Sequence, residues 1–251
     1  LSEENRRYVK AGLQALRKTK SPGLLALYQV SGVQSSELTE IDIGFGLAPR
    51  INAAGRLQHA IHAVKCLAAN HEEEAMEHAA LLETLNRERQ EIVEQMTQEA
   101  LAAMNGEQPV RQVIVLAKEG WHQGVVGIVA SRLVDRFHVP VFLLSLDRET
   151  GKAKGSARSI PGYDIHQALT ICDDLLDHYG GHAAAGGLSL DAHRIDDLTI
   201  RLQDFADKYL QLEDWKAELP VDLVCKPEDI TTEVIDSLQL LAPYGQGIPQ
   251  P

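Results

Sequence analysis

The spacing of apolar residues divides the chain into a helical first part and a later part in which strands alternate with helices. Amphipathic stretches fill the chain up to about residue 70, with the helix breaker SPG at 21–23 between two of them. From 71 to 104, apolar residues recur at steps of four and seven, which predicts one long helix. The recurring residues are Leu81, Leu85, Ile92, Met96 and Ala100. A helix of this length either bridges two domains or lies along one, and periodicity leaves both open.

After residue 109 the pattern changes to short apolar runs separated by turns and amphipathic stretches. Strands are predicted at 110–120, 139–146, 152–159 and 188–190. Helices are predicted at 123–137, 164–179 and 192–210. Asp164 is expected to cap the second of these helices. The alternation predicts an α/β fold, with a sheet flanked by helices and preceded by the helical segment and the long helix.

The composition is that of an ordinary globular protein, with 44% apolar and 24% charged residues in 251. No apolar run reaches about 18 residues, so no membrane span is expected. The charged start LSEENRRYVK is not typical of a signal peptide and suggests an excerpt that is already entering a helix. Three scattered cysteines, Cys66, Cys172 and Cys225, favour reduced thiols in the cytoplasm over disulfides or a zinc site.

The net charge of −12 argues against general nucleic-acid binding, but the charge is unevenly distributed. Residues 151–163 contain Lys152, Lys154 and Arg158 and no acidic residue. A basic strip on an acidic protein is either a phosphate site or a solvated hairpin face. The composition does not decide between these two interpretations.

Two motifs combine hydrogen-bond donors with small neighbouring residues. GFGLAPRINAAGRL carries Arg50, Asn52 and Arg56. One guanidinium group can bind two phosphate oxygens at once. The alternative is a close helix contact with two surface arginines. KGSARS places Ser156 and Arg158 on one face of a strand, where they either hold a terminal phosphate or lie exposed.

Two histidines lie in glycine-containing segments between predicted elements. His122, in EGWHQGVV, either donates to a phosphate at a helix N-terminus or caps that helix. In YGGHAAAGG, Gly180 and Gly181 predict a turn whose backbone N–H groups face an anion. His182 would add a further donor to that turn.

A metal site is not predicted in this chain. Asp177, His178 and His182 would need a helix to align the two imidazoles, and the glycines between them break it. The chain also lacks Asp-His-His, HExxH and CxxC motifs, a Walker loop and a Gly-x-Ser-x-Gly elbow. Phosphodiester hydrolysis normally uses metal ions, so the chain is expected to carry substrate-binding groups without the metal centre.

The motifs occur together in an order that resembles the RecJ family of the DHH phosphoesterase superfamily. They are NRRYVKAGL, GFGLAPRINAAGRL, NRERQ, GWHQGVVGIVASRL, KGSARS, GGHAAAGG and LAPYGQGIPQP, and they span nearly the whole chain. Members of this family are bacterial single-strand-specific 5′→3′ DNA exonucleases. The resemblance therefore implies a function in DNA repair and recombination.

The resemblance also implies a division of the chain into four regions. These are the end of a DHH domain (1–70), a connecting helix (71–105), a DHH-associated domain with a mixed sheet (106–212) and the approach to an OB-fold (213–251). The N-terminal metal-binding part and the OB-fold are expected to be missing. The ligands of Mn²⁺ or Mg²⁺ would then lie outside the chain, and the fragment alone would be inactive.

The resemblance assigns the 5′-phosphate pocket to Ser156 and Arg158. Either Arg50 or Arg56 is expected to join it, and the pattern does not choose between them. Asn52 belongs to the same motif as these two arginines.

By the same resemblance, His182 with Gly180 and Gly181 lies beside the metal centre, at the nucleotide that is cleaved. His122 is expected to line the same cleft.

The implied substrate is single-stranded DNA, bound by a monomer in the bacterial cytoplasm, with single-strand-binding protein and a RecQ-type helicase as partners. One alternative is an oligoribonuclease or cyclic-dinucleotide phosphodiesterase of the same superfamily, which lacks the APYGQG continuation. Another is a non-catalytic nucleic-acid-binding scaffold. The intact set of Ser156, Arg158 and His182 argues against the scaffold.

Overall fold

The computed structural model describes residues 3–104, 112–210 and 221–250. These residues form two compact units, Leu1–Glu88 with Leu219–Pro251, and Arg89–Glu218. The division falls inside one continuous helix, which contributes residues to both units.

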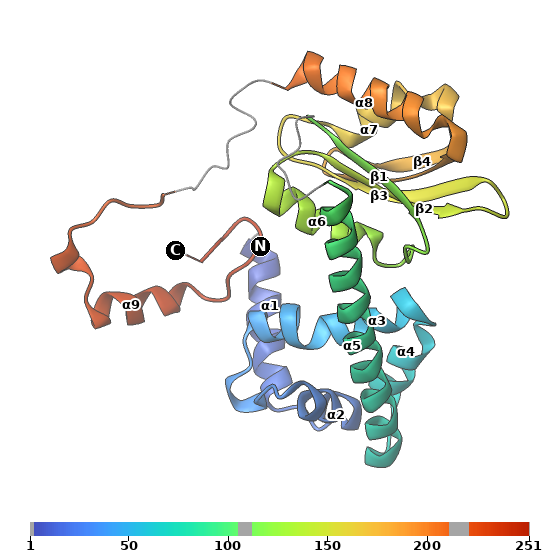
Figure 1. The fold of residues 1–251 in the computed structure, drawn as a ribbon. Helices are drawn as coiled ribbons and strands as arrows, with labels where there is room; N and C mark the ends of the chain where they lie inside the picture. The colour runs from blue at the N-terminus through green and yellow to red at the C-terminus, as the bar shows by residue number, and fades with distance from the viewer. Residues whose placement is uncertain (1–2, 105–111, 211–220, 251) are drawn as a thin grey trace. The chain divides into compact units, whose positions relative to one another are not determined.

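The first unit is built from helices around an apolar core, as the sequence predicts (Figure 1). Leu27, Leu38 and Leu82 are fully buried at its centre. Pro22 in the first turn starts the second helix, and Gly32, with a φ of 72°, ends it. The elements are α1 (Glu3–Arg17), α2 (Pro22–Ser31), η1 (Ser35–Glu37), the π-helix η2 (Asp42–Leu47), α3 (Ala48–Leu57), α4 (Ile61–Ala68) and the first half of α5 (Glu72–Ala103).

The long helix predicted over 71–104 is confirmed as α5. Its buried apolar residues are Ala75, Ala79, Leu82, Leu85, Val93, Met96 and Ala100. Leu81 and Ile92, which belong to the predicted apolar face, are only half-buried. Their neighbours Leu82 and Val93 are buried instead, because at 3.6 residues per turn they fall on the same stripe as the buried alanines, and Leu81 and Ile92 fall at its edge.

The second unit is a five-stranded mixed sheet with helices on both faces. The strands are β1 (Ile114–Glu119), β2 (Val141–Asp147), β3 (Lys152–Arg158), β4 (Leu176–His182) and β5 (Ala185–Asp191). Their order is β1-β2-β3-β5-β4. Strands β1 and β2 are parallel and are joined by α6 (Val126–Phe137), and the other neighbours are antiparallel. The predicted α/β fold, with a mixed sheet flanked by helices after a helical segment and a long helix, is confirmed.

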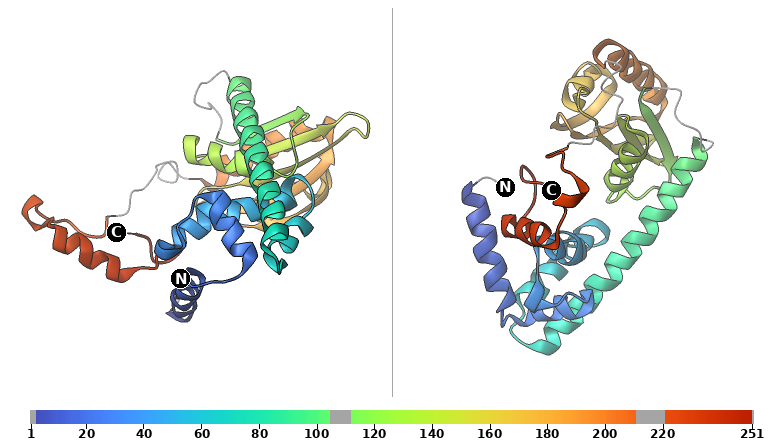
Figure 2. Two further views of the ribbon diagram at one scale, coloured as in Figure 1. Left: turned by 90° about the horizontal axis from the view of Figure 1, so that it is seen from below. Right: turned by 90° about the vertical axis from the view of Figure 1, so that its left-hand side faces the viewer.

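The helices cover the two faces of the sheet unequally (Figures 1 and 2). Helices α7 (Ile165–Thr170) and α8 (Ile195–Tyr209, after the 3₁₀ turn η4, Ala192–Arg194) lie on one face. There Phe142, Ala157 and Leu190 of the sheet are fully buried together with Leu202 of α8. Helix α6 lies on the other face, over β2 and β3.

The helix predicted over 164–179 is wrong in its second half. Asp164 caps α7 as expected, because its carboxylate accepts from the Gln167 N–H at 3.0 Å, but the helix ends at Thr170. A 3₁₀ turn, η3 (Asp173–Leu175), follows, and Leu176 begins β4. Residues 176–182 have helix-like spacing, but pairing with β5 determines their conformation.

The described residues 221–250 contain η5 (Pro227–Asp229), α9 (Thr232–Leu238) and η6 (Gln239–Leu241). The hydroxyl of Thr231 caps α9 by accepting from the Val234 N–H at 3.3 Å. The first residues of the regions predicted at 106–212 and 213–251 lie outside the described residues. Among the described helices, none combines the length and apolar character needed to cross a membrane.

Candidate functional site

Cross-strand pairing places the KGSARS motif beside the glycine-rich hairpin. Residues directly opposite each other in neighbouring strands point to the same face of a sheet. Two adjacent rows therefore share one face of β3, β5 and β4. They are Ser156, Gly187 and Gly180, and, one step along the strands, Arg158, Ala185 and His182. The prediction that Ser156 and Arg158 lie on one strand face agrees with this register.

An open pocket of about 430 Å³ lies on this face of the sheet. The pocket reaches the sheet backbone at Gly187, which has no side chain. A Cβ added there would meet only the Gly155 carbonyl oxygen, at 3.8 Å. An added Cβ at Gly180, in the same row, would meet nothing within 4 Å. Polar side chains line the pocket from Gln123, Lys154, Ser156, His178 and Ser189. The missing side chains thus let a ligand approach the sheet backbone.

Helix α6 approaches β3 closely at Gly127, which leaves room for the side chain of Arg158. A Cβ on Gly127 would lie 2.8 Å from Nη2 of Arg158 and 3.5 Å from Cβ of Ser156. Nη1 of Arg158 donates to the Ala157 carbonyl at 2.8 Å. The guanidinium is therefore half-buried and held against the helix, which limits the rotamers open to it.

His122 lies in the turn before α6 and does not cap that helix, whose N-cap residue is Val125. Its Nδ1 accepts from the Gly124 N–H at 3.1 Å, and its carbonyl accepts from the Val125 N–H at 3.0 Å. It lines a different hollow, of about 590 Å³, whose rim also carries Glu119 and Asp147. Carboxylates repel a phosphate, so this hollow is less suited to one than the pocket at Ser156.

The loop that carries His122 is tied to the long helix through Glu99 of α5. The buried Trp121 donates from Nε1 to Glu99 at 2.9 Å, and Lys118 forms an ion pair with the same carboxylate oxygen at 3.0 Å. Hydrogen bonds from Lys118 and then from Gln95 and Trp121 lower the pKa of Glu99. The second half of α5 therefore helps to position the loop between β1 and α6.

The prediction of a glycine turn at Gly180 and Gly181 is wrong. Both residues lie inside β4, and the turn of the hairpin falls on 183–184. They pair with Gly187 and Gly186 of β5, and Gly186 must lack a side chain because a Cβ there would lie 2.7 Å from Ile165 of α7. Gly186 therefore allows close packing against α7 on one face of the sheet, and Gly180 and Gly187 leave the other face open.

His182 ends β4 and is exposed, and its Nδ1 accepts from the Ala184 N–H at 3.2 Å. It is four residues from His178 on the same strand, which corresponds to roughly 13 Å. That separation is too large for two ligands of one ion. Within residues 3–104, 112–210 and 221–250, no three His, Cys, Asp or Glu side chains form a group that could hold a metal. The described residues thus do not fit a divalent metal centre.

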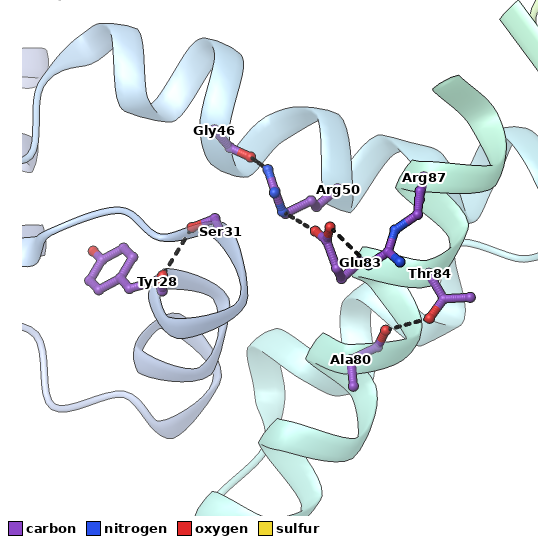
Figure 3. A network of polar contacts seen from close by, with 8 residues as sticks. All are labelled: Tyr28, Ser31, Gly46, Arg50, Ala80, Glu83, Thr84 and Arg87. Atoms are coloured by element: carbon purple, nitrogen blue, oxygen red, sulfur yellow. Dashed lines mark hydrogen bonds and ion pairs between the residues drawn. The ribbon is translucent and has the colours of Figure 1, made fainter. Parts of the chain in front are cut away.

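The GFGLAPRINAAGRL motif lies in the first unit, on η2 and α3. Figure 3 shows Arg50 between α5 and the preceding turn: Nε contacts Glu83 at 2.6 Å, and Nη1 donates to the Gly46 carbonyl at 2.6 Å. Arg50 is largely buried in this network, whereas Asn52 and Arg56 are exposed. Of the two arginines, Arg56 is thus the more accessible to a ligand.

The sequence predicts Lys154 only as part of a basic strip, and it does not predict the pocket residues His178 and Ser189 as phosphate-binding residues. The signal available for Lys154 is its position two residues before Ser156 in a strand, which puts it on the same face. His178 and Ser189 could not be found in this way, because their place depends on the pairing of β4 with β5.

Comparison with known proteins identifies the sheet unit and the chain around it. A family model described as the DHHA1 domain matches residues 111–208, from the start of β1 to the end of α8. The whole chain is 46% identical to the single-stranded-DNA-specific exonuclease RecJ of Bacillus subtilis and covers 32% of that protein. It is 35% identical to the Escherichia coli protein of the same name and covers 45% of it.

Solved structures agree with these sequence matches. A crystal structure of RecJ in complex with Mg²⁺ from Thermus thermophilus superimposes on 98% of this chain with a TM-score of 0.87 and 34% identity. A structure of exonuclease RecJ bound to manganese matches 82% of it with a TM-score of 0.70 and 33% identity. The chain covers 38% and 50% of these two chains. Residues 111–208 are therefore similar to the DHHA1 domain, and the whole chain is similar to one part, less than half, of the Bacillus subtilis and Escherichia coli RecJ proteins.

Proposed function

We propose that this chain is the substrate-positioning part of a metal-dependent exonuclease that degrades single-stranded DNA from its 5′ end. The observation that carries the proposal is the open polar face of the sheet, where Ser156 lines a glycine-floored pocket and Arg158 lies in the next row. Similarity to RecJ proteins along the entire chain supports it. The division into DHH-domain end (1–70), connecting helix (71–105), DHH-associated domain (106–212) and onward connection (213–251) belongs to the same proposal.

In this proposal, Ser156 and Arg158 bind the terminal 5′-phosphate. A guanidinium offers two parallel donors to phosphate oxygens, and the hydroxyl adds a third on the same face. The contact of Arg158 with Gly127 fixes the guanidinium before the strand arrives. Binding then costs less side-chain entropy, and the strand end is held in one register relative to the cleaved bond.

His182 lies in the same row as Arg158, two strands away, and is exposed. We place it at the terminal nucleotide of the strand, as a hydrogen-bond donor. Arg56, exposed on α3, is proposed to be the arginine of the first unit that contacts the strand. His122 lies in the turn before α6, in the hollow beside Glu119 and Asp147, and is left outside the proposed phosphate site.

The metal ions are proposed to bind outside these 251 residues. Relatives have been crystallised with Mg²⁺ and with Mn²⁺, whereas the described residues offer no three-ligand group. Such ions would supply the activated water and balance charge on the cleaved phosphate. The groups of this chain bind and orient the strand.

Arg158→Ala tests the proposal in the RecJ-type protein that contains this chain. Loss of a charged hydrogen-bond donor should weaken binding of a 5′-phosphorylated oligothymidylate by about 10-fold or more, and binding of its 5′-hydroxyl counterpart much less. Arg148→Ala is the matched control, since Arg148 is exposed and pairs with Glu119 away from the pocket. Equal losses for the two strands would remove Arg158 from the phosphate pocket.

A further inference from the structure

A second row of polar residues lies beside the proposed phosphate site, and the proposed function does not involve it. Two residues along the strands from Ser156, Gly187 and Gly180, the register aligns Lys154, Ser189 and His178. All three line the pocket that Ser156 also lines. Because alternate residues share a face, this row points the same way as the first, at a separation of roughly 7 Å.

The three side chains form no hydrogen bond or ion pair with the described residues. Among the described residues, neither Lys154 nor His178 forms an ion pair or hydrogen bond through its side chain. The hydroxyl of Ser189 likewise has no partner in the described part of the chain, although Ser189 is only 8% exposed. The hydroxyl oxygen of Ser189 is not among the fully buried, unpartnered side-chain atoms of the described residues, so it is open to the pocket and can hydrogen-bond to a ligand there.

The neighbouring lysine behaves differently. Lys152, two residues earlier on the same strand face, contacts Asp177 at 2.9 Å and Asp191 at 2.8 Å. Hydrogen bonds to Asp191 and Asp177 raise the pKa of Lys152. Lys152 thus offsets part of the charge of two carboxylates at the sheet end, while Lys154 forms no such ion pair and lines the pocket.

Asp147 lies near enough to Lys154 for the charge of the lysine to contribute to lowering the pKa of Asp147, but the ion pairs of the described residues do not include this pair. Its carboxylate accepts from the Glu149 N–H at 2.9 Å and the Thr150 N–H at 3.3 Å, within the turn between β2 and β3. These turn contacts, chiefly those of Thr150, lower the pKa of Asp147. The N-terminal end of α6, with Val126 and Gln123 on the pocket wall, adds partial positive charge on the opposite side.

We propose that Lys154, Ser189 and His178 form a second phosphate subsite, which binds a second phosphate of the ligand held at Ser156. The inference rests on the proposed function, which places the first phosphate in the row of Ser156 and Arg158. The second phosphate is either the next internucleotide phosphate or the outer phosphate of a 5′-triphosphate end. Both present the same anionic oxygens to an ammonium group and a hydroxyl.

The test is calorimetric titration of the 251-residue chain with three ligands. Thymidine 5′-monophosphate carries one phosphate, the dinucleotide pTpT adds an internucleotide phosphate, and thymidine 5′-triphosphate extends the 5′ end. Lys154→Gln should lower affinity for pTpT or for the triphosphate about 5- to 10-fold and affinity for the monophosphate less than about 2-fold. The ligand that loses affinity identifies the source of the second phosphate. Lys208→Gln, on α8 on the opposite face of the sheet, removes the same charge and should leave the affinity for all three ligands unchanged.

Arg158→Ala separates this inference from the proposed function. If Arg158→Ala leaves monophosphate binding intact while Lys154→Gln weakens one of the larger ligands, the second subsite stands and the first assignment fails. Equal losses for all three ligands on Lys154→Gln, or no loss for any, overturn the subsite. Failure of the chain to bind any of the three ligands at millimolar concentration overturns both.

Discussion

Gly127 of α6 and Arg158 of β3 lie so close that a methyl group on Gly127 would be 2.8 Å from Nη2 of Arg158. Gly127→Ala should therefore displace the guanidinium without harming the fold, because that group is the far end of a flexible side chain. Alanine also favours a helix over glycine by about 1 kcal/mol. We expect unchanged or higher thermal stability together with weaker binding of 5′-phosphorylated strands, measured by melting and by fluorescence anisotropy.

Gly12→Ala in α1 is the control for this substitution, since an added Cβ there meets nothing within 4 Å. It should raise stability by a similar amount and leave binding unchanged. Unaltered strand binding by Gly127→Ala would show that the position of Arg158 does not matter for the substrate.

Two strand glycines should respond oppositely to alanine. At Gly187 the nearest atom to a new Cβ is 3.8 Å away, so Gly187→Ala should fold normally and place a methyl group on the pocket floor, which lowers phosphate affinity. At Gly155 a new Cβ would lie 2.0 Å from the Leu143 carbonyl oxygen. Gly155→Ala should lower the free energy of unfolding by about 1–3 kcal/mol. Urea unfolding and phosphate titration measure both effects, and a destabilised Gly187→Ala variant would contradict the open floor.

Glu99 should make stability depend on pH. Its pKa is lowered in the folded state, first by Lys118, from about 4.3 in the unfolded chain. The ionised carboxylate therefore stabilises the fold above about pH 4.3, and this contribution is lost as the pH falls through the lower folded value. Glu99→Gln should be less stable than the parent at pH 7, and the difference should shrink towards pH 3.

The measurement for Glu99 is urea unfolding at pH 7, 5 and 3. Glu91→Gln, at an exposed position on the same helix, is the control and should follow the parent curve. A constant difference between Glu99→Gln and the parent at all three pH values would show that the contacts with Lys118 and Trp121 do not favour the ionised form.

The cysteines should differ in reactivity. Burial raises the pKa of Cys172 to about 11, and burial also raises the pKa of Cys66, whereas Cys225 is exposed. Because the thiolate is the reactive form, iodoacetamide at pH 8 should modify Cys225 in the native chain and leave the other two intact. Peptide mass spectrometry identifies the modified cysteines. In urea, where the chain is unfolded, all three cysteines should react. Native labelling of Cys172 would contradict its buried position.

Much of the fold could be predicted from local pattern. Helix α5 and strands β1, β2 and β3 are long or strongly periodic, so their own residues specify them. The strand predicted at 188–190 lies within β5, but β4 and its pairing with β5 could not be predicted, because YGGHAAAGG looks like a turn until Gly180 and Gly181 are paired with Gly187 and Gly186.

The candidate site, like the fold, could be predicted only where local sequence pattern determines it. Ser156 and Arg158 share a face by strand alternation alone, and the sequence shows both. Lys154 has the same signal but is indistinguishable in sequence from a solvated strand residue. His178 and Ser189 join it only through the sheet register, which no local pattern contains.

The central claim is that the open face of the sheet binds the phosphates of a single strand. The most direct measurement is an NMR titration of the ¹⁵N-labelled chain with a 5′-phosphorylated oligothymidylate. The account predicts that the largest amide shifts occur at Ser156, Gly180 and Gly187 and that they are much smaller with the 5′-hydroxyl strand. Shifts confined to α7 and α8 on the opposite face, or equal shifts with both strands, would contradict it.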